Sequence, residues 1–269
     1  MNIDKVVGAP FQYSDSYVQF LAFLKIGFKI PYRMVQGIVR GLSDYVRIIE
    51  EIIHFTHIRR RMIRVKPSSL EIDIGNDNDG KEEEPITLIV DDASGLTVSR
   101  EGHYIEQKWI RKKKEFVKLH IAVDAKSKKV VSFRITKGTV HDTKKFCPLV
   151  RDAAEKYDIK KLHADKAHDN RRNFNLLDEM DVEPAIEIRN NASIRSGGCR
   201  LRREEVLLIK KLGYQGWKHL KDAGKRWLAE IAFSSIKRVL GEDLLSRKFS
   251  TQKVEARLKV MLYNKFIGL

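Results

Sequence analysis

Two short apolar segments of the sequence end in aspartate, and these acids are the first candidates for chemistry. The segment LIVDD covers residues 88–92, and KLHAD covers residues 161–165. In open α/β sheets, functional side chains gather at the carboxyl ends of the strands. If the two strands are neighbours, Asp92 and Asp165 face each other, and they repel unless a divalent cation lies between them. The pattern therefore predicts a cation site, although an aspartate that ends a strand also often caps the next turn.

A third acid, Glu230, lies in a late helical segment and completes the candidate site. Three carboxylates can hold two Mg²⁺ ions about 3.5–4 Å apart, one activating an attacking hydroxyl and the other stabilising the leaving oxygen. Arg226 precedes Glu230 by four residues and Lys237 follows it by seven, so the three share one helical face. Such a trio alone indicates a surface stripe of ion pairs. Beside two strand-end aspartates, we interpret Arg226 and Lys237 as contacts to phosphate groups.

Two of these acids have a neighbour that competes for the same position. Asp91 competes with Asp92, and because adjacent side chains of a strand point to opposite faces, only one is expected to face the site. The resemblance described at the end of this subsection favours Asp92, through its D-x-x-G match to Gly95. Glu242 competes with Glu230, but it lies near a helix end and lacks the Arg and Lys spacing. We therefore take Asp92, Asp165 and Glu230 as the candidate ligands.

The chain is strongly basic, and this predicts a polyanionic partner. It has 52 Lys and Arg against 36 Asp and Glu, which gives a net charge of +16. Nucleic acid is the commonest polyanion in a cell, although a merely basic or ribosome-associated protein is the alternative. One basic segment also contains Trp109 and Phe116, and would follow a DNA backbone and stack on bases. Its cations, which would equally protect a hairpin edge from aggregation, are Lys108, Arg111, Lys112, Lys113, Lys114 and Lys118.

Cysteine usage and the first residues predict a cytoplasmic, nucleoid-associated protein. Cys147 and Cys199 are too few and too isolated for a disulfide framework or a zinc site, and they indicate a reducing compartment. The first residues lack the pattern of a secretion signal. The apolar stretch at residues 17–30 is interrupted by polar residues and falls short of the roughly 20 apolar residues that span a bilayer. No membrane partner is expected.

Helical periodicity predicts an N-terminal region of three short helices, at residues 14–26, 32–40 and 45–58. They fit a helix-turn-helix-like DNA-binding bundle and a generic helical appendage almost equally well. A basic exit follows, made of Arg59, Arg60, Arg61, Arg64 and Lys66. We expect this region to cover residues 1–66 and an acidic, turn-rich linker to cover residues 67–85.

From residue 86 to 269 the pattern predicts an α/β domain. Three antiparallel strands come first, and two parallel strands with intervening helices follow. The strands are expected at 86–90, 116–123, 130–136, 161–164 and 183–188, and the helices at 143–156, 170–180, 204–222, 225–240 and 251–267, with a polar loop at 189–204.

Three side chains near these elements are expected to serve the fold rather than the chemistry. Asp169 is predicted to cap the helix that opens at Asn170. Asp142, after His141, is predicted to cap the helix from 143, although the pair could instead approach the cation site. Trp227 is predicted to lie in the core rather than to act as a base wedge.

Three collinear motifs in this domain resemble those of DDE transposases of prokaryotic insertion sequences, the insertion-sequence four and five superfamily. Residues 92–96 (DASGL) resemble the signature D-[ST]-T-G-[LI]. Residues 163–169 (HADKAHD) resemble A-D-x-[AG]-Y-D, with His168 in place of tyrosine. The segment from Arg226 to Lys237 resembles Y-x2-R-x3-E-x6-K, with Ala223 at the tyrosine position.

The resemblance implies an RNase H-like mixed sheet flanked by helices, with Asp92, Asp165 and Glu230 as catalytic metal ligands. It implies DNA cleavage at element ends and strand transfer into target DNA, with two Mg²⁺ ions for which Mn²⁺ can substitute. The implied partners are terminal inverted repeats, target double-stranded DNA and a second copy of the chain in a synaptic homodimer. The alternatives are another RNase H-like nuclease, or a catalytically inactive, domesticated DNA-binding protein derived from a transposase.

Overall fold

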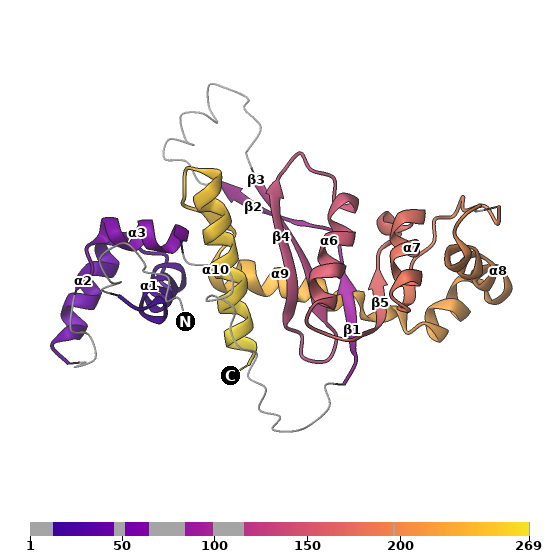
Figure 1. Ribbon diagram of the computed structural model, residues 1–269, viewed down its shortest axis with the longest axis horizontal. Helices are drawn as coiled ribbons and strands as arrows, with labels where there is room; N and C mark the ends of the chain where they lie inside the picture. The colour runs from indigo at the N-terminus through magenta and orange to yellow at the C-terminus, as the bar shows by residue number, and fades with distance from the viewer. Residues whose placement is uncertain (1–12, 46–51, 65–83, 99–115, 196, 269) are drawn as a thin grey trace, which may run out of the picture. The chain divides into compact units, whose positions relative to one another are not determined.

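The computed structural model describes residues 13–45, 52–64, 84–98, 116–195 and 197–268 (Figure 1). The chain divides into two compact units, Met1–Asp73 and Ile74–Leu269. Within the described part of the chain, no helix is both long enough and apolar enough to cross a bilayer.

The first unit contains three helices: α1 (Asp15–Gly27), α2 (Tyr32–Ser43) and α3 (Phe55–Arg64). Helix α1 begins after Ser14, whose Oγ accepts a hydrogen bond from the backbone N–H of Tyr17 at 3.2 Å. This satisfies one of the N–H groups left without a partner at the start of a helix. The helices bury a small set of apolar side chains, which includes Val35, Val39, Ile58 and Met62.

Helix α3 differs from the sequence prediction, because it begins at Phe55 rather than near residue 45. The arginines predicted to follow a helix, Arg59, Arg60, Arg61 and Arg64, therefore lie within it. The N–H of Phe55 donates to Oε1 of Gln36 at 3.1 Å, so the first turn of α3 is capped from α2. A cap supplied nineteen positions away along the chain leaves no local signal in the sequence.

The second unit is built on a mixed sheet of seven strands: β1 (Ile86–Val90), β2 (Ser94–Val98), β3 (Phe116–Asp124), β4 (Val130–Lys137), β5 (Ile159–Ala164), β6 (Glu183–Ile186) and β7 (Asp243–Leu244). Strand β3 pairs antiparallel with β1, β2 and β4. Strands β5 and β6 extend the sheet from β1 in parallel, and the two-residue β7 pairs in parallel with β2. The predicted antiparallel start and parallel continuation are confirmed, as is a mixed sheet. Strands β2 and β7 were not predicted.

A bulge separates β1 from β2, and Asp91 and Asp92 lie in it. Strand β4 occupies one edge of β3, so β1 and β2 share the other. Val90 pairs with Ala122 and Ser94 pairs with Leu119, so residues 91–93 oppose only residues 120–121. One extra residue therefore stands on this side of the pair, which is the defining feature of a β-bulge. Such bulges often redirect side chains next to active sites.

Helices cover both faces of the sheet and close two separate cores (Figure 1). Helices α6 (Thr143–Ala154), α7 (Arg171–Glu179) and α8 (Arg200–Leu220) contribute to the core that contains β5. Helices α9 (Trp227–Leu240) and α10 (Phe249–Ile267) contribute to the opposite core, which contains most of β3. The predicted flanking helices are thus confirmed.

Helix α8 begins at Arg200, inside the segment predicted as a loop, and is bent at Gly213. Gly213 has φ 70° and ψ 168°, a conformation that residues with a Cβ atom strongly avoid. The bend lets the second half of α8 fold back before the 3₁₀ turn η2 (Ala223–Arg226) leads into α9.

Candidate active site at the ends of the central strands

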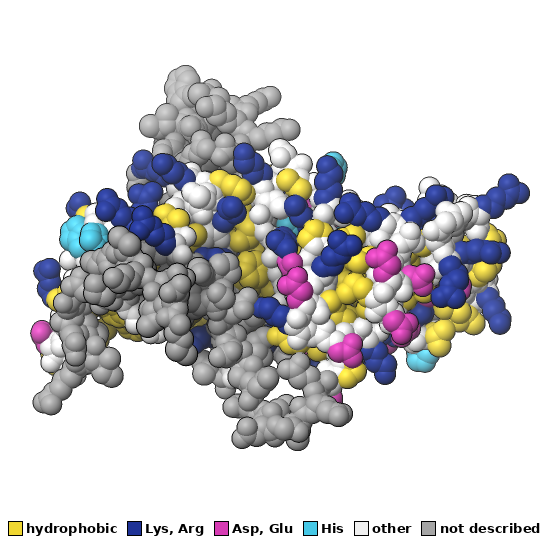
Figure 2. All heavy atoms as spheres, in the orientation of Figure 1, with side chains coloured by type: hydrophobic (Ala, Val, Ile, Leu, Met, Phe, Trp, Pro, Cys, Tyr) yellow, Lys and Arg dark blue, Asp and Glu magenta, His cyan; other side chains and the backbone are white. Residues whose placement is uncertain are grey.

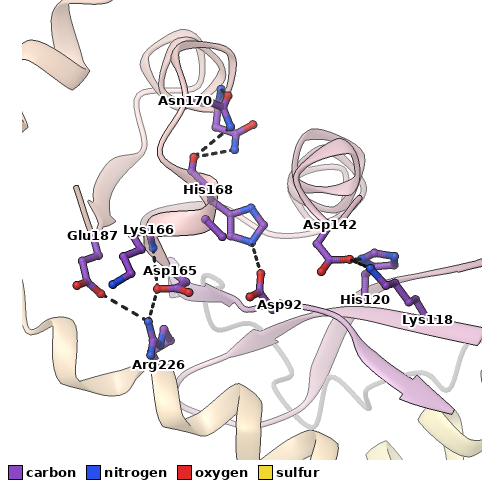
Figure 3. A network of polar contacts seen from close by, with 12 residues as sticks. Asp92, Lys118, His120, Asp142, Asp165, Lys166, His168, Asn170, Glu187 and Arg226 are labelled. Atoms are coloured by element: carbon purple, nitrogen blue, oxygen red, sulfur yellow. Dashed lines mark hydrogen bonds and ion pairs between the residues drawn. The ribbon is translucent and has the colours of Figure 1, made fainter. Parts of the chain in front are cut away.

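The central parallel pair of strands brings the two predicted aspartates to the same edge of the sheet. Strands β1 and β5 are neighbours, and Val90 pairs with Ala164. Asp92 therefore follows β1 and Asp165 directly follows β5, on adjacent strands (Figure 3). Burial raises the pKa of Asp92, and the negative charges of Asp165 and Asp142 raise it further. The two strands are thus neighbours, as the prediction assumed, and the charge of Asp165 acts on Asp92.

A buried histidine lies against Asp92. His168 is 1% exposed, and its Nε2 lies 3.8 Å from Oδ1 of Asp92. Neither ring nitrogen has a hydrogen-bond partner among the residues that the structure describes. Burial lowers the pKa of His168, although the charges of Asp92, Asp165 and Asp142 oppose that shift. His168 occupies the motif position that is usually tyrosine, so this chain places an imidazole beside the first acid.

Arg226 neutralises the second acid. Its Nη1 donates a hydrogen bond of 2.6 Å to Oδ1 of Asp165 and lies 3.7 Å from Oε2 of Glu187 (Figure 3). The same Asp165 oxygen accepts the N–H of Lys166 at 2.7 Å and caps the 3₁₀ turn η1 (Lys166–His168). Burial opposes the charge of Arg226, but the surrounding carboxylates, led by Asp165 and Asp91, raise the pKa of its guanidinium. Arg226 thus supplies positive charge among the acids.

The charges of the site shift the pKa of both acids in the bulge, Asp91 and Asp92. Burial raises the pKa of Asp91, the charge of Arg226 lowers it, and that of Glu230 raises it. Burial raises the pKa of Asp92 as well, His168 and Arg226 lower it, and Asp165 raises it. The strand alternation used to choose between Asp91 and Asp92 does not apply, because residues 91–93 lie outside both strands.

The third acid, Glu230, lies in the first turn of α9 and is exposed. It is near enough to Asp91 and Arg226 for its charge to affect the pKa of both. Lys237 is half-buried in the last turn of the same helix. Across the described ranges, no three His, Cys, Asp or Glu side chains are gathered closely enough to hold one metal ion. The donor set itself fits a hard cation, because carboxylate oxygens are the ligands that Mg²⁺ prefers.

A cavity of about 190 Å³ opens beside Glu230 and Arg226. Its walls include the aromatic rings of Tyr214, Trp217 and Trp227. Trp227 is 52% exposed, so the prediction that it lies in the core is wrong. The reason is the phase of α9, which buries the next two residues, at 228 and 229, and turns the ring of Trp227 outward.

A second buried histidine, His163, lines the same cavity. It is 2% exposed, and neither of its ring nitrogens has a hydrogen-bond partner within the described residues. Burial lowers its pKa to about 4, so the ring is neutral at physiological pH. A neutral imidazole can both donate and accept hydrogen bonds. The cavity therefore combines aromatic walls with groups able to bind the polar edge of a planar molecule.

Asp142 occupies the N-cap position of α6, as predicted, but its side chain accepts no capping hydrogen bond. Its Oδ1 accepts a hydrogen bond of 3.0 Å from Nζ of Lys118 and lies 3.8 Å from Nδ1 of His120 (Figure 3). Lys118 is therefore paired with an acid rather than free on a hairpin edge. The sequence signal was present in the His141-Asp142 pair, but the partners of Asp142 lie on β3 and were not predicted.

Asp169 does not cap α7 either, because the cap is the next residue, Asn170. Oδ1 of Asn170 accepts the N–H of Asn173 at 3.0 Å. The carboxylate of Asp169 is buried and instead binds Arg202 and the N–H of Arg189. The predicted DNA contacts Lys108, Arg111, Lys112, Lys113 and Lys114 lie outside the described residues.

Comparisons with known proteins identify the family. Two family models, both described as "Transposase DDE domain", match residues 83–265 and residues 2–101. Among solved structures, the chain is similar to the catalytic core domain of BIV integrase, with 12% identity, 66% of this chain and 82% of that chain covered, and a TM-score of 0.33. It is also similar to the Mos1 strand transfer complex, with 13% identity, coverages of 99% and 77%, and a TM-score of 0.35. Because the first family match spans more than half of its 269 residues, the chain belongs to the Transposase DDE domain family.

Proposed function

We propose that the protein is an active transposase of a prokaryotic insertion sequence, of the insertion-sequence four and five superfamily. It cleaves DNA at the ends of its element and joins the freed 3′ ends to target DNA. The observation that carries this proposal is the pairing of β1 with β5, which puts Asp92 and Asp165 at one edge of the sheet. Family membership makes DNA transposition the activity to expect from such a pair.

Asp92, Asp165 and Glu230 are the residues that would hold Mg²⁺ or Mn²⁺. The bound cations would supply activation of the attacking hydroxyl and neutralise charge as the phosphodiester bond breaks. The electrostatics support this assignment, because the charge of Asp165 raises the pKa of Asp92 and a cation would relieve their repulsion. Asp91 is the alternative ligand on the first strand, since it responds to Glu230 and Arg226.

DNA is the proposed partner of both units. The net charge of +16 favours association with a polyanion, and Arg226 and Lys237 would contact phosphates near the scissile bond. Residues 1–66 would bind the terminal inverted repeat, residues 67–85 would act as a linker, and residues 86–269 would carry out catalysis. On the face drawn in Figure 2, Lys and Arg side chains are spread over the end of the second unit that carries α8, which supports a DNA track there. A homodimer would hold two element ends together.

The cavity beside Glu230 would accept an unpaired base from the cleaved end. The exposed rings of Tyr214 and Trp227 offer stacking surfaces, and Trp227 is the more exposed of the two. Stacking on an aromatic ring contributes about 1–3 kcal/mol per base and tolerates any sequence. The neutral His163 would face the edge of the base.

The test is an excision and joining assay with purified protein. The substrate is a plasmid in which the DNA that flanks this gene on both sides surrounds a marker, with a second plasmid as target. Wild-type protein with Mg²⁺ should release the marker and join it to the target. Asp92→Asn, Asp165→Asn and Glu230→Gln should each abolish both steps while retaining binding to the flanking DNA in a gel-shift assay. Glu242→Gln, which changes an acid outside the site, is the matched control.

Two other functions predict different results in the same assay. Another RNase H-like nuclease would cut the DNA but join nothing. A domesticated DNA-binding protein would bind the flanking DNA and neither cut nor join it. Cleavage by the triple variant of Asp92, Asp165 and Glu230 at the wild-type rate would exclude the proposed ligands.

A further inference from the structure

The turn that carries Asp165 is held by side chains from two other parts of the fold, the segment after β6 and the start of α7. The turn η1 exposes its carbonyl groups to neighbours rather than continuing as a helix. The Nε and Nη2 atoms of Arg189 donate to the carbonyls of Lys166 and Ala167, at 3.2 and 3.4 Å. The side-chain amides of Asn170 and Asn173 donate to the carbonyl of His168, at 3.2 and 2.9 Å (Figure 3).

A single buried carboxylate fixes one of these holding groups, Arg189. The side chain of Asp169 has no exposed surface, and it binds Arg202 through two parallel hydrogen bonds of 2.5 and 3.0 Å. Its Oδ2 also accepts the backbone N–H of Arg189 at 3.0 Å, which fixes the residue whose guanidinium reaches back to η1. Bidentate pairs of this kind set geometry as well as adding energy. Asp169 therefore connects α8, the segment after β6 and the turn that follows Asp165.

We propose that Asp169 is a positioning residue, which acts through Arg202 and Arg189 to fix the turn that carries Asp165. Arg189, whose backbone Asp169 fixes, binds carbonyls within two positions of Asp165 along the chain. Asp169 itself contacts neither substrate nor cation. Because a carboxylate ligand must be held within a fraction of an ångström of its working position, loosening this turn weakens the cation site without removing a ligand. This inference rests on the proposed function only in that it takes Asp165 to be a ligand.

A matched control exists on α8, the helix that carries Arg202. Glu205 is as buried as Asp169, at 4% exposure each. It accepts a hydrogen bond from Trp217 and pairs with Lys221, both at 2.8 Å, without contacting η1. Glu205→Gln and Asp169→Asn therefore remove the same charge from similar surroundings. A purely structural role for Asp169 predicts the same phenotype for both variants.

The experiment combines hydrogen exchange and metal titration on the full chain. Asp169→Asn should speed exchange of the backbone amides of residues 166–169 roughly tenfold relative to the wild type. In calorimetry with Mn²⁺ alone, it should weaken binding about tenfold. Arg202→Lys keeps the positive charge but donates from a single nitrogen. It should retain most of the exchange protection that Arg202→Gln loses. Glu205→Gln should lower global stability and leave both local measurements unchanged.

Two results would overturn the proposal. One is wild-type exchange at residues 166–169 together with wild-type Mn²⁺ binding in Asp169→Asn. The other is an equal local change in Glu205→Gln. If Asp169→Asn does not fold, Arg202→Gln carries the same expectations. Neither measurement uses DNA cleavage, so failure of the transposition assay and failure of the positioning role are separate outcomes.

Discussion

Replacing Arg226 by alanine should lower the stability of the metal-free protein and make stability depend more strongly on Mg²⁺. The guanidinium binds Asp165 at 2.6 Å and lies 3.7 Å from Glu187. It is also attracted to Asp91 and Glu230. Without it, these four carboxylates repel one another with no positive group among them. A bound divalent cation would replace the missing charge.

The magnitude follows from the exposure of the pair. The side chains of Arg226 and Asp165 are 36% and 21% exposed, so water screens much of their attraction. Pairs of this kind contribute about 0.2–1 kcal/mol, and the hydrogen bond with its several acidic neighbours puts this one near the upper end. A loss of about 1 kcal/mol lowers the melting temperature of a domain of about 200 residues by roughly 2–4 °C. Saturating Mg²⁺ should remove at least half of that difference.

Thermal unfolding of Arg226→Ala and wild type, in EDTA and in MgCl₂, measures both effects. Arg134→Ala is the control, because Arg134 pairs with Asp152 at 44% and 35% exposure on another part of the sheet. The control should lose a similar amount of stability in EDTA and regain none with Mg²⁺. Two results would refute this reasoning. One is that Mg²⁺ reduces the stability loss of Arg226→Ala and that of Arg134→Ala by the same amount, and the other is that Arg226→Ala is as stable as the wild type in EDTA. Either would show that Arg226 does not supply the positive charge that a bound cation would otherwise provide.

Three further predictions concern other parts of the second unit. Burial lowers the pKa of His120 to about 4 in the folded protein. Below about pH 6.5 this histidine is therefore protonated in the unfolded chain but stays neutral in the folded one, down to about pH 4. At pH 5 the difference lowers the free energy of unfolding by about 2 kcal/mol. Urea titrations at neutral and acidic pH should show that His120→Gln loses this part of the pH dependence, and an unchanged pH slope would contradict it. Gly213→Ala should lose about 1–3 kcal/mol in the same titrations, because alanine is strained at φ 70°; Gly224→Ala, at a site with open space, should stay close to the wild type. Trp227→Ala should leave the melting temperature nearly unchanged but weaken binding of a single-stranded overhang by about 1–3 kcal/mol in fluorescence anisotropy, and equal affinity would rule out stacking on this ring.

The paired aspartates could be predicted because each one lies within two positions of the end of an apolar run of strand length. That signal is local, and so were the signals for α7, α9 and α10. The pairing of β1 with β5 joins residues far apart in the sequence. We inferred it from the order of the elements and from the motifs that resemble those of DDE transposases. The membership in the Transposase DDE domain family agrees with that inference.

The partners of Asp142 and Asp169 could not be predicted, because both acids bind cations that are distant in the sequence. Capping was the reasonable local interpretation of each, and in each case a long-range arginine or lysine outcompetes the nearby backbone N–H groups. The exposure of Trp227 depends on the phase of α9, which a tryptophan among apolar residues does not reveal. The bulge was equally hidden, since the register between strands is not a property of either strand alone.

The extra residue at 91–93 separates the chemistry of this chain from the packing of its two cores. Leu88 and Val90 lie in one core and Leu96 and Val98 in the other, although all four are an even number of positions apart. Deleting one residue between Val90 and Ser94 would restore a regular ladder and leave all four side chains facing the cores that they occupy now, because residues an odd number of positions apart point to opposite faces of a strand. The two cores therefore do not require the extra residue, and the additional length serves the segment that carries Asp91 and Asp92.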